Sequence, residues 1–219
     1  MKFSYIVILI STFFVSGSMA VSQTSSGTQE YGDGGAYEGE FLNGLPHGNG
    51  TYELPNGYRY VGEWFEGEIN GQGEALFPNG SVYIGSFVKG KPEGSGKITF
   101  TDGGTYEGEW ANGSITGEGY AKYANGTTYQ GTFLDAMHDG KGIMKSPDGY
   151  IYDGTWENGV KQGKATVTYP DGSIYTGDLV KIDDEYMLID DVGVGEVETL
   201  CRAVSYTHLR AHETDSYLV

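Results

Sequence analysis

Paired carboxylates are the residues of this sequence most readily associated with chemistry. Glu107 and Glu109 form a pair of the kind that acid/base catalysis uses. Their spacing on a predicted strand places both in one solvent-facing row, whereas a glycosidase pair lies across a cleft in two unequal environments. We therefore predict a solvated face here and no acid/base site.

The other polar motifs do not match known metal or phosphate sites. His47 and His138 fall in predicted surface turns and lack a partner at a metal-ligand spacing. Gly94-Ser95-Gly96-Lys97 superficially resembles a phosphate-binding loop, but Ile98 stands where that loop requires Ser or Thr. The acidic pairs within 183–191 lack EF-hand spacing. The sequence thus predicts no metal, no cofactor and no enzymatic activity.

A fixed step of 23 residues organises the chain. It separates tyrosines that are each followed two places later by glycine: Tyr37, Tyr60, Tyr83, Tyr106, Tyr129, Tyr152 and Tyr175. Counted from each tyrosine as position 0, position 4 holds Phe41, Trp64, Phe87, Trp110, Phe133 and Trp156, and glycines recur at positions 2, 11, 13 and 20. Such regularity is typical of stacked units that cover one another's faces.

The alternation of tyrosine, glycine and a second aromatic ring has the period of a β-strand, so the three residues share one face. The glycine leaves a gap that a neighbouring ring can fill. Pairs such as Asn56-Gly57 predict a tight hairpin turn, and positions 5 to 10 predict a wider one. We expect an all-β protein, an elongated single-layer antiparallel sheet of repeated β-hairpins with a ring-lined trough. The rings at positions 0 and 4 are its predicted core, and ligand binding in the trough is the alternative.

The motif Tyr-Glu-Gly-Glu-Trp at 106–110, followed by Asn-Gly and by Gly-x-Gly at 117–119, resembles the MORN repeat. Six full copies cover about 37–172, and a partial seventh covers 173–179. The resemblance implies a non-catalytic scaffold whose array mediates protein contacts or self-association, or lies at a membrane. Arrays of this family often accompany a separate catalytic or targeting domain.

The ends of the chain differ from the array. Residues 1–20 read as a secretory signal peptide, with an uncleaved membrane anchor as the alternative. We expect a flexible linker over 21–34, the repeat array over 35–179, and an acidic cap or linker over 180–203. Residues 204–219 resemble a translated sequencing adapter. The expected location is therefore secreted or in the lumen of the secretory pathway.

The net charge of the chain restricts the classes of partner that it can bind. The formal net charge is −17, from 13 basic and 30 acidic residues, which disfavours nucleic acid and anionic lipid. The function we expect is a scaffold for an unknown protein partner or for self-association outside the cytosol. The alternatives are a membrane-lipid-binding array and the regulatory part of a larger enzyme whose C-terminal domain is missing.

Two surface features complete the sequence-based predictions. Apolar residues on the face opposite the rings would form a partner-binding surface if they were contiguous: Val61, Leu76, Ile84, Tyr120 and Ile143. Of the Asn-x-Ser/Thr sequons, Asn112 is the best glycosylation candidate, because Asn79 and Asn125 lie in the predicted tight turns.

Overall fold

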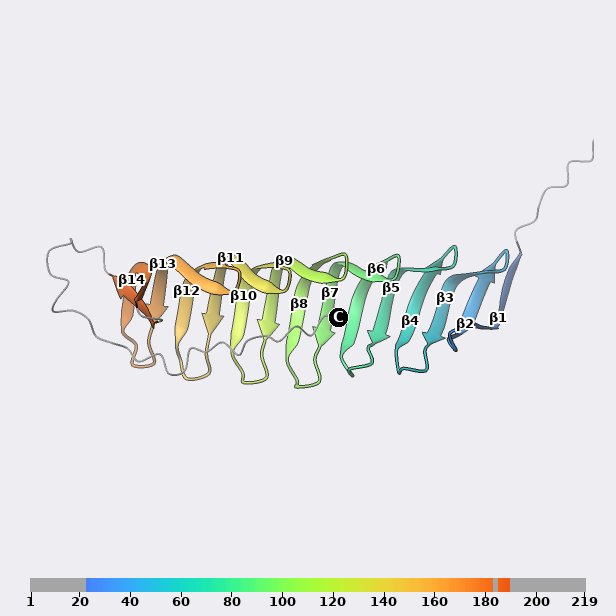
Figure 1. The fold of residues 1–219 in the computed structure, drawn as a ribbon, viewed down its shortest axis with the longest axis horizontal. Coiled ribbons are helices and arrows are strands. Elements are labelled where there is room, and N and C mark those ends of the chain that lie inside the picture. The colour runs from blue at the N-terminus through green and yellow to red at the C-terminus, as the bar shows by residue number, and fades with distance from the viewer. Residues whose placement is uncertain (1–22, 183–184, 190–219) are drawn as a thin grey trace, which may run out of the picture.

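The computed structural model describes residues 23–182 and 185–189 of the chain, and these residues form one continuous sheet. Its strands are β1 (Thr24–Glu30), β2 (Ala36–Leu42), β3 (Leu45–Glu53), β4 (Arg59–Phe65), β5 (Glu68–Leu76), β6 (Val82–Val88), β7 (Lys91–Thr99), β8 (Thr105–Ala111), β9 (Ser114–Lys122), β10 (Thr128–Leu134), β11 (Met137–Lys145), β12 (Ile151–Glu157), β13 (Val160–Thr168), β14 (Ile174–Ile182) and β15 (Glu185–Ile189). Each strand pairs antiparallel with the next, so sequence order is also spatial order along an elongated array (Figure 1). The predicted fold class is confirmed.

Two turns alternate along the array, and the prediction assigned their sizes the wrong way round. Asn43-Gly44 closes a two-residue loop between the paired Leu42 and Leu45, and both loop residues have positive φ (53° and 83°). That geometry matches the twist of adjacent strands. Asn56-Gly57 instead belongs to a three-residue loop in which only the glycine has positive φ, at 93°. Asn56 stabilises this loop through its side chain, because its Oδ1 accepts a hydrogen bond from the Tyr58 N–H at 2.9 Å.

One two-residue loop carries alanine where the other repeats have glycine. Ala136 has a φ of 63°, a left-handed conformation that disfavours a side chain. We expect Ala136→Gly to raise the free energy of unfolding by about 1 kcal/mol, measured as a higher urea midpoint at unchanged slope. The matched control is Gly113→Ala at the same position of the fourth repeat, where φ is 89° and a Cβ meets nothing closer than 3.9 Å. Gly113→Ala should lower the free energy of unfolding by a similar amount. A lower free energy of unfolding for Ala136→Gly would contradict the left-handed conformation assigned to Ala136.

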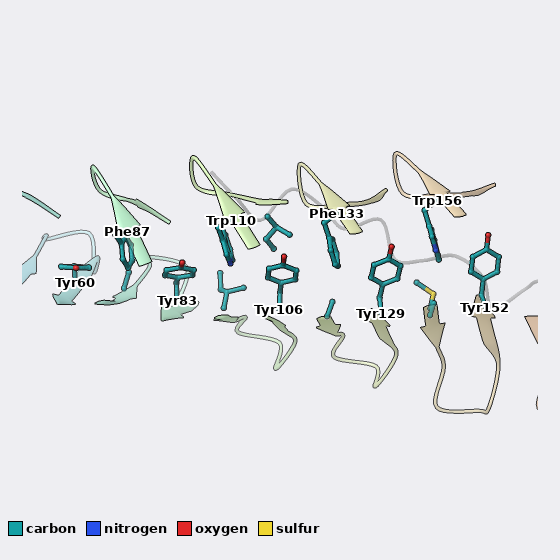
Figure 2. Packing of buried hydrophobic residues seen from close by; sticks show 14 of the residues in the cluster. Tyr60, Tyr83, Phe87, Tyr106, Trp110, Tyr129, Phe133, Tyr152 and Trp156 are labelled. Atoms are coloured by element: carbon teal, nitrogen blue, oxygen red, sulfur yellow. The ribbon is translucent and has the colours of Figure 1, made fainter. Parts of the chain in front are cut away.

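A row of glycines crosses the sheet where positions 2 and 13 pair, from Gly27 on β1 to Gly177 on β14, with Ala165 as its one exception. Within each of the six full repeats the register shifts immediately after this row; in the fourth, Gly108 pairs with Gly119 but Trp110 pairs with Ile115. Such bulges bend a strand. Each hairpin therefore bends over its own rings. Figure 2 shows the result: the position-0 rings come from one half of the bent hairpins, the position-4 rings come from the other half, and both lie in one row.

The bulge explains why position 0 is tyrosine and not phenylalanine. The carbonyl of position 3 accepts a hydrogen bond from the tyrosine hydroxyl of the same repeat, as in the 3.0 Å contact from Tyr106 Oη to Glu109 O. The same bond recurs from Tyr37, Tyr60, Tyr83, Tyr129 and Tyr152 at 2.7 to 3.1 Å. Burial raises the pKa of Tyr106 to about 12, so the hydroxyl keeps its proton for this bond.

The rings form the core by contacts between repeats. Tyr83 meets the edge of Phe87 from its own repeat at 5.1 Å and of Trp110 from the next at 4.9 Å. The position-0 tyrosines from Tyr37 to Tyr152 are buried, whereas Phe41 at the N-terminal end is only partly buried. Tyr175 is 40 % exposed, which corrects its assignment to the core. The seventh repeat has Leu179 in place of the ring, so Tyr175 lacks that partner.

The structure also corrects the predicted linker at 21–34. Residues 24–30 form β1, which pairs along its whole length with β2 and places Gly27 opposite Gly39. The repeat pattern could have predicted this strand, because Gly27 and Asp33-Gly34 stand 23 residues before Gly50 and Asn56-Gly57. Within the predicted cap or linker, β15 pairs with β14. The predicted signal peptide, residues 190–203 of the predicted cap or linker and the adapter-like segment lie outside the described residues.

Candidate interaction surface

The inner, ring-bearing face is closed. Tyr60, Tyr83 and Tyr129 have no exposed surface, and Trp110 retains 3 %. The bend at each bulge brings the two halves of the hairpin together over these rings (Figure 2). Ligand binding in a ring-lined trough is therefore contradicted, and contacts with another molecule must use the outer face or the turns.

The outer face does not join the predicted partner residues into one patch. Ile84 is 55 % exposed and pairs with Glu74, which in turn lies beside Val61; Leu76 lies two residues further along the same strand. Lys97 and Glu107 then separate Ile84 from Tyr120, and Gln130 separates Tyr120 from Ile143. Leu76 lies diagonally opposite both Val61 and Ile84 and joins these three into one patch. No predicted partner residue joins Tyr120 to Ile143, or either of them to this patch.

A second apolar row runs beside the two-residue turns and was missed by the sequence reasoning. Its exposed members occupy positions 5 and 8, which alternate with the inward-facing positions 4 and 9; we call them the tip row: Leu45, Phe65, Val88, Leu134, Met137 and Val160. The signal was the recurrence of apolar residues at position 5, as in Phe65, Val88 and Leu134. It was overlooked because a wide loop was assigned to these positions.

Backbone hydrogen bonds hold the turns in line along the tip row. The Gly67 N–H donates to the Pro46 carbonyl of the preceding repeat at 2.9 Å, and the Ala136 N–H donates to Ile115 in the same way. Equivalent bonds connect the other turns of the full repeats. The tip row is therefore presented by a laterally bonded edge and not by separate loops.

The acidic outer face is partly structural. The carboxylates of Glu40 and Glu63, at position 3, accept backbone N–H groups of Asn49 and Gln72 at 3.1 and 2.8 Å, beside the bulge. Glu107 is exposed, and its Oε2 lies 3.5 Å from Lys97 Nζ. Among residues 23–182 and 185–189, no group of three or more His, Cys, Asp or Glu side chains is arranged to hold a metal ion.

His138 is not a surface-turn residue as predicted. It occupies position 9 on the inner side of β11, where its ring stacks on Tyr129 at 3.7 Å and its Nε2 lies 2.6 Å from Tyr123 Oη. Burial, together with the nearby charge of Lys161, lowers the pKa of His138 to about 4. His47 lies near Phe65 beside the tip row, with ring centroids 5.3 Å apart.

This burial predicts an acid-sensitive core. The unfolded histidine titrates near 6.5 and the folded one near 4, so stability is lost as pH falls between these values. The loss is about 3 kcal/mol and is complete below the folded pKa. His138→Ile, which carries the residue found at position 9 in Ile69 and Ile115, should lack this component in urea unfolding at pH 7 and pH 4. An equal acid loss in both proteins would contradict the prediction, and His47→Ala is the control.

Asn112 lies at an exposed turn. It is the first residue of the two-residue loop of the fourth repeat, with a φ of 52°, and its N–H donates to Glu93 Oε2 at 2.8 Å. The side chain of this sequon therefore lies at the edge of the array beside the tip row, where a glycan would be free of the core.

Comparison with known protein families identifies the type of repeat. The MORN repeat family model matches residues 37–57, 60–82, 83–105, 106–128, 129–149 and 152–174. No curated protein sequence matches the chain. Among the described residues, no helix has the length and apolarity of a membrane span.

Solved structures with a similar course of strands share little sequence with the chain. One is the TCP10 domain of Danio rerio CPAP in complex with a peptide of Danio rerio STIL, at 17% identity and a TM-score of 0.43, covering 73% of this chain and 69% of that one. Another is the TCP domain of Drosophila melanogaster SAS-4 in complex with a proline-rich motif of Ana2, at 9% identity and a TM-score of 0.43, covering 80% and 97%.

Proposed function

Because the chain belongs to the MORN repeat family, we propose that it is a non-catalytic scaffold that binds a protein partner along the tip row, outside the cytosol. The observation that carries the proposal is the line of exposed apolar side chains beside hydrogen-bonded turns, including Leu45, Phe65 and Val88. The rings that would otherwise offer binding surface are buried. Exposed apolar side chains gathered on one edge are typical of partner surfaces.

The spacing of the tips favours an extended partner segment. Successive tips are two strands apart, or about 9.6 Å at 4.8 Å per strand. A polyproline II segment advances about 9.3 Å in three residues, so the apolar residues of a partner with one at every third position would step in register with the tips. The fourth repeat, with Ala111 and Ser114 at positions 5 and 8, interrupts the apolar tips between Val88 and Leu134. The net charge of −17 favours basic residues between the apolar residues of the partner.

Site-specific photo-crosslinking tests the scaffold. A benzophenone side chain at Phe65 of the full chain should give a discrete protein adduct in secretory-pathway extracts, and the same probe at Thr51 on the outer face should not. The outcomes that overturn the proposal are lipid adducts with pelleting on anionic vesicles, which support the membrane alternative, and adducts equal to those at Thr51. Adducts of the chain with itself would identify the partner as a second copy.

A peptide titration tests the spacing. A proline-based peptide with leucine at every third residue and arginine between should bind more tightly than an isomer with leucine at every second residue. Phe65→Ser combined with Val88→Ser should remove the difference, while Ile84→Ser on the outer face should not. Equal binding of the two peptides would exclude this partner class but leave the crosslinking result intact.

The extracellular setting rests on residues 1–20 and has its own test. Expression of the full chain in a secreting host should yield a product whose N-terminus is Val21. Retention of the intact N-terminus in the membrane fraction would support the anchored alternative. Recovery of the transcript's 3′ end tests whether an enzyme domain follows the array, because a stop codon soon after Arg202 would exclude it.

A further inference from the structure

The row of repeats, as far as the structure describes it, has half a repeat at each end. β1 corresponds to a second half, because Gly27 stands 23 residues before Gly50, the position-13 glycine of the first full repeat. β14 corresponds to a first half, because it holds Tyr175 at position 0 and Gly177 at position 2. The two strands lie toward opposite ends of the array (Figure 1). Among the described residues, each end thus lacks the half-repeat that the other end carries.

The N-terminal end has an unfilled place for a ring. In the full repeats, a Cβ on the position-13 glycine, such as Gly50, would overlap the position-0 tyrosine of the same repeat. On Gly27, the one described atom that a Cβ would meet within 4 Å is Phe41 Cε2, at 3.8 Å. Trp64 packs on Tyr37 of the preceding repeat at 4.8 Å, whereas Phe41 meets only the ring of its own repeat in the described part of the chain.

The C-terminal end has a ring without a place. Tyr175 is 40 % exposed, whereas the six preceding position-0 tyrosines retain at most 2 %. On the side of β14 that faces away from β13, β15 pairs with residues 178–182 alone. Within residues 23–182 and 185–189, no strand therefore pairs with residues 174–177 on that side. In a full repeat this stretch pairs with positions 13 to 16, as Gly39 does with Gly50.

We propose that a second copy of this chain fills the unfilled place, so that β14 of one copy pairs antiparallel with β1 of the next and completes one repeat. An unpaired strand edge is a template for another strand, and here the repeat supplies the register. It sets Gly177 opposite Gly27 and Tyr175 opposite Gln29, the equivalents of two pairs within the first full repeat. The glycine row then continues from one copy into the next.

The same register brings the two unsatisfied rings together. Tyr175 of one copy covers Gly27 of the next, as the other position-0 tyrosines cover their own position-13 glycines. It also meets Phe41 there, in the edge-to-face arrangement that Tyr37 and Trp64 have within one chain. The contact joins unlike ends, so every copy in the assembly retains one free end of each kind until it is paired. Such a heterologous contact produces open head-to-tail chains.

Two features of the chain oppose this association. Copies that each carry a net charge of −17 repel one another, so added salt should strengthen the contact. Ile189 of β15 pairs with Asp178, the residue after Gly177. A strand that places Gly27 opposite Gly177 brings Ser26 to this point, so it must displace the end of β15. β15 thus protects the edge in the absence of a second copy.

Sedimentation velocity of the full chain, as released by a secreting host, tests the contact. The weight-average sedimentation coefficient should rise with protein concentration, and more steeply at high salt. Gly27→Val fills the unfilled place and should weaken association roughly tenfold or more. It should not lower the melting temperature, because a Cβ at Gly27 meets no backbone atom within 4 Å. Thr28→Val, on the other face of the same strand, is the matched control and should associate as the unchanged chain does.

A mixture of two variants tests the head-to-tail geometry. Tyr175→Ala removes the ring from the other end and should weaken self-association as Gly27→Val does. The two variants mixed together should form heterodimers and nothing larger, because each supplies the one intact end that the other lacks.

A chain that stays monomeric at every concentration and salt would overturn the proposal. Loss of association in Gly27→Val but not in Tyr175→Ala would overturn it as well, since β1 would then pair with β1 of the second copy. The crosslinking test at Phe65 is independent, because the tip row lies beside the turns and this contact uses the ends of the sheet. Either result can fail without the other.

Discussion

Gly108→Ala should lower the free energy of unfolding by about 3 kcal/mol, at the upper end of overpacking effects. A Cβ at this position would lie 2.6 Å from the Glu118 carbonyl oxygen and 2.6 Å from the Gly119 Cα. Both are backbone atoms of the paired strand, so no side chain can move aside to make room. Urea denaturation followed by tryptophan fluorescence measures the loss.

The opposite member of the same glycine pair is the control. A Cβ on Gly119 would meet side-chain atoms of Tyr106 at 2.4 to 2.7 Å, and none of the three nearest atoms is backbone. The chain itself carries alanine at this position in the sixth repeat, where Ala165 is buried opposite Gly154. Gly119→Ala should therefore cost only about 1 kcal/mol. Equal losses for the two variants would show that the strands do not approach as closely as the register implies.

Trp110→Ala should cost about 3–5 kcal/mol. The indole packs between Tyr83 of the preceding repeat and Tyr106 of its own, at 4.9 and 5.7 Å, and its N–H donates to the Gly96 carbonyl at 3.3 Å. In an array stabilised by contacts between neighbours, a cavity at the centre weakens the coupling of its two halves. Thermal unfolding followed by circular dichroism should show a lower and broader transition.

Two further variants test whether ring packing between repeats is the source of this stability. Trp110→Phe should lose only about 1 kcal/mol, because phenylalanine occupies the same position at Phe87 and Phe133. Phe41→Ala should lose less than Trp110→Ala, since Phe41 is only partly buried and lies at the N-terminal end of the array. If Phe41→Ala cost as much as the central variant, the contacts between repeats would not be the source of stability.

Local patterns account for most of what could be predicted. Alternation along one strand placed Tyr106 and Trp110 on the same face without any knowledge of the neighbouring strand. The same alternation placed Glu107 on the outer side, where it is exposed. What failed were features that depend on pairing: the residues enclosed by each turn, the burial of His138, and the strand β1 formed by an incomplete repeat.

The amino-acid sequence by itself determined the period, the strand alternation, the ring-bearing face and the MORN family, because each of these is carried by residues close together along the chain. Only the tertiary structure decided that the ring face is closed and that the exposed apolar residues line the turns. Both follow from the register shift after each glycine pair, which bends the hairpin. The same shift leaves Phe65 and Val88 outside. A register is a relation between two strands, so neither strand's sequence states it alone.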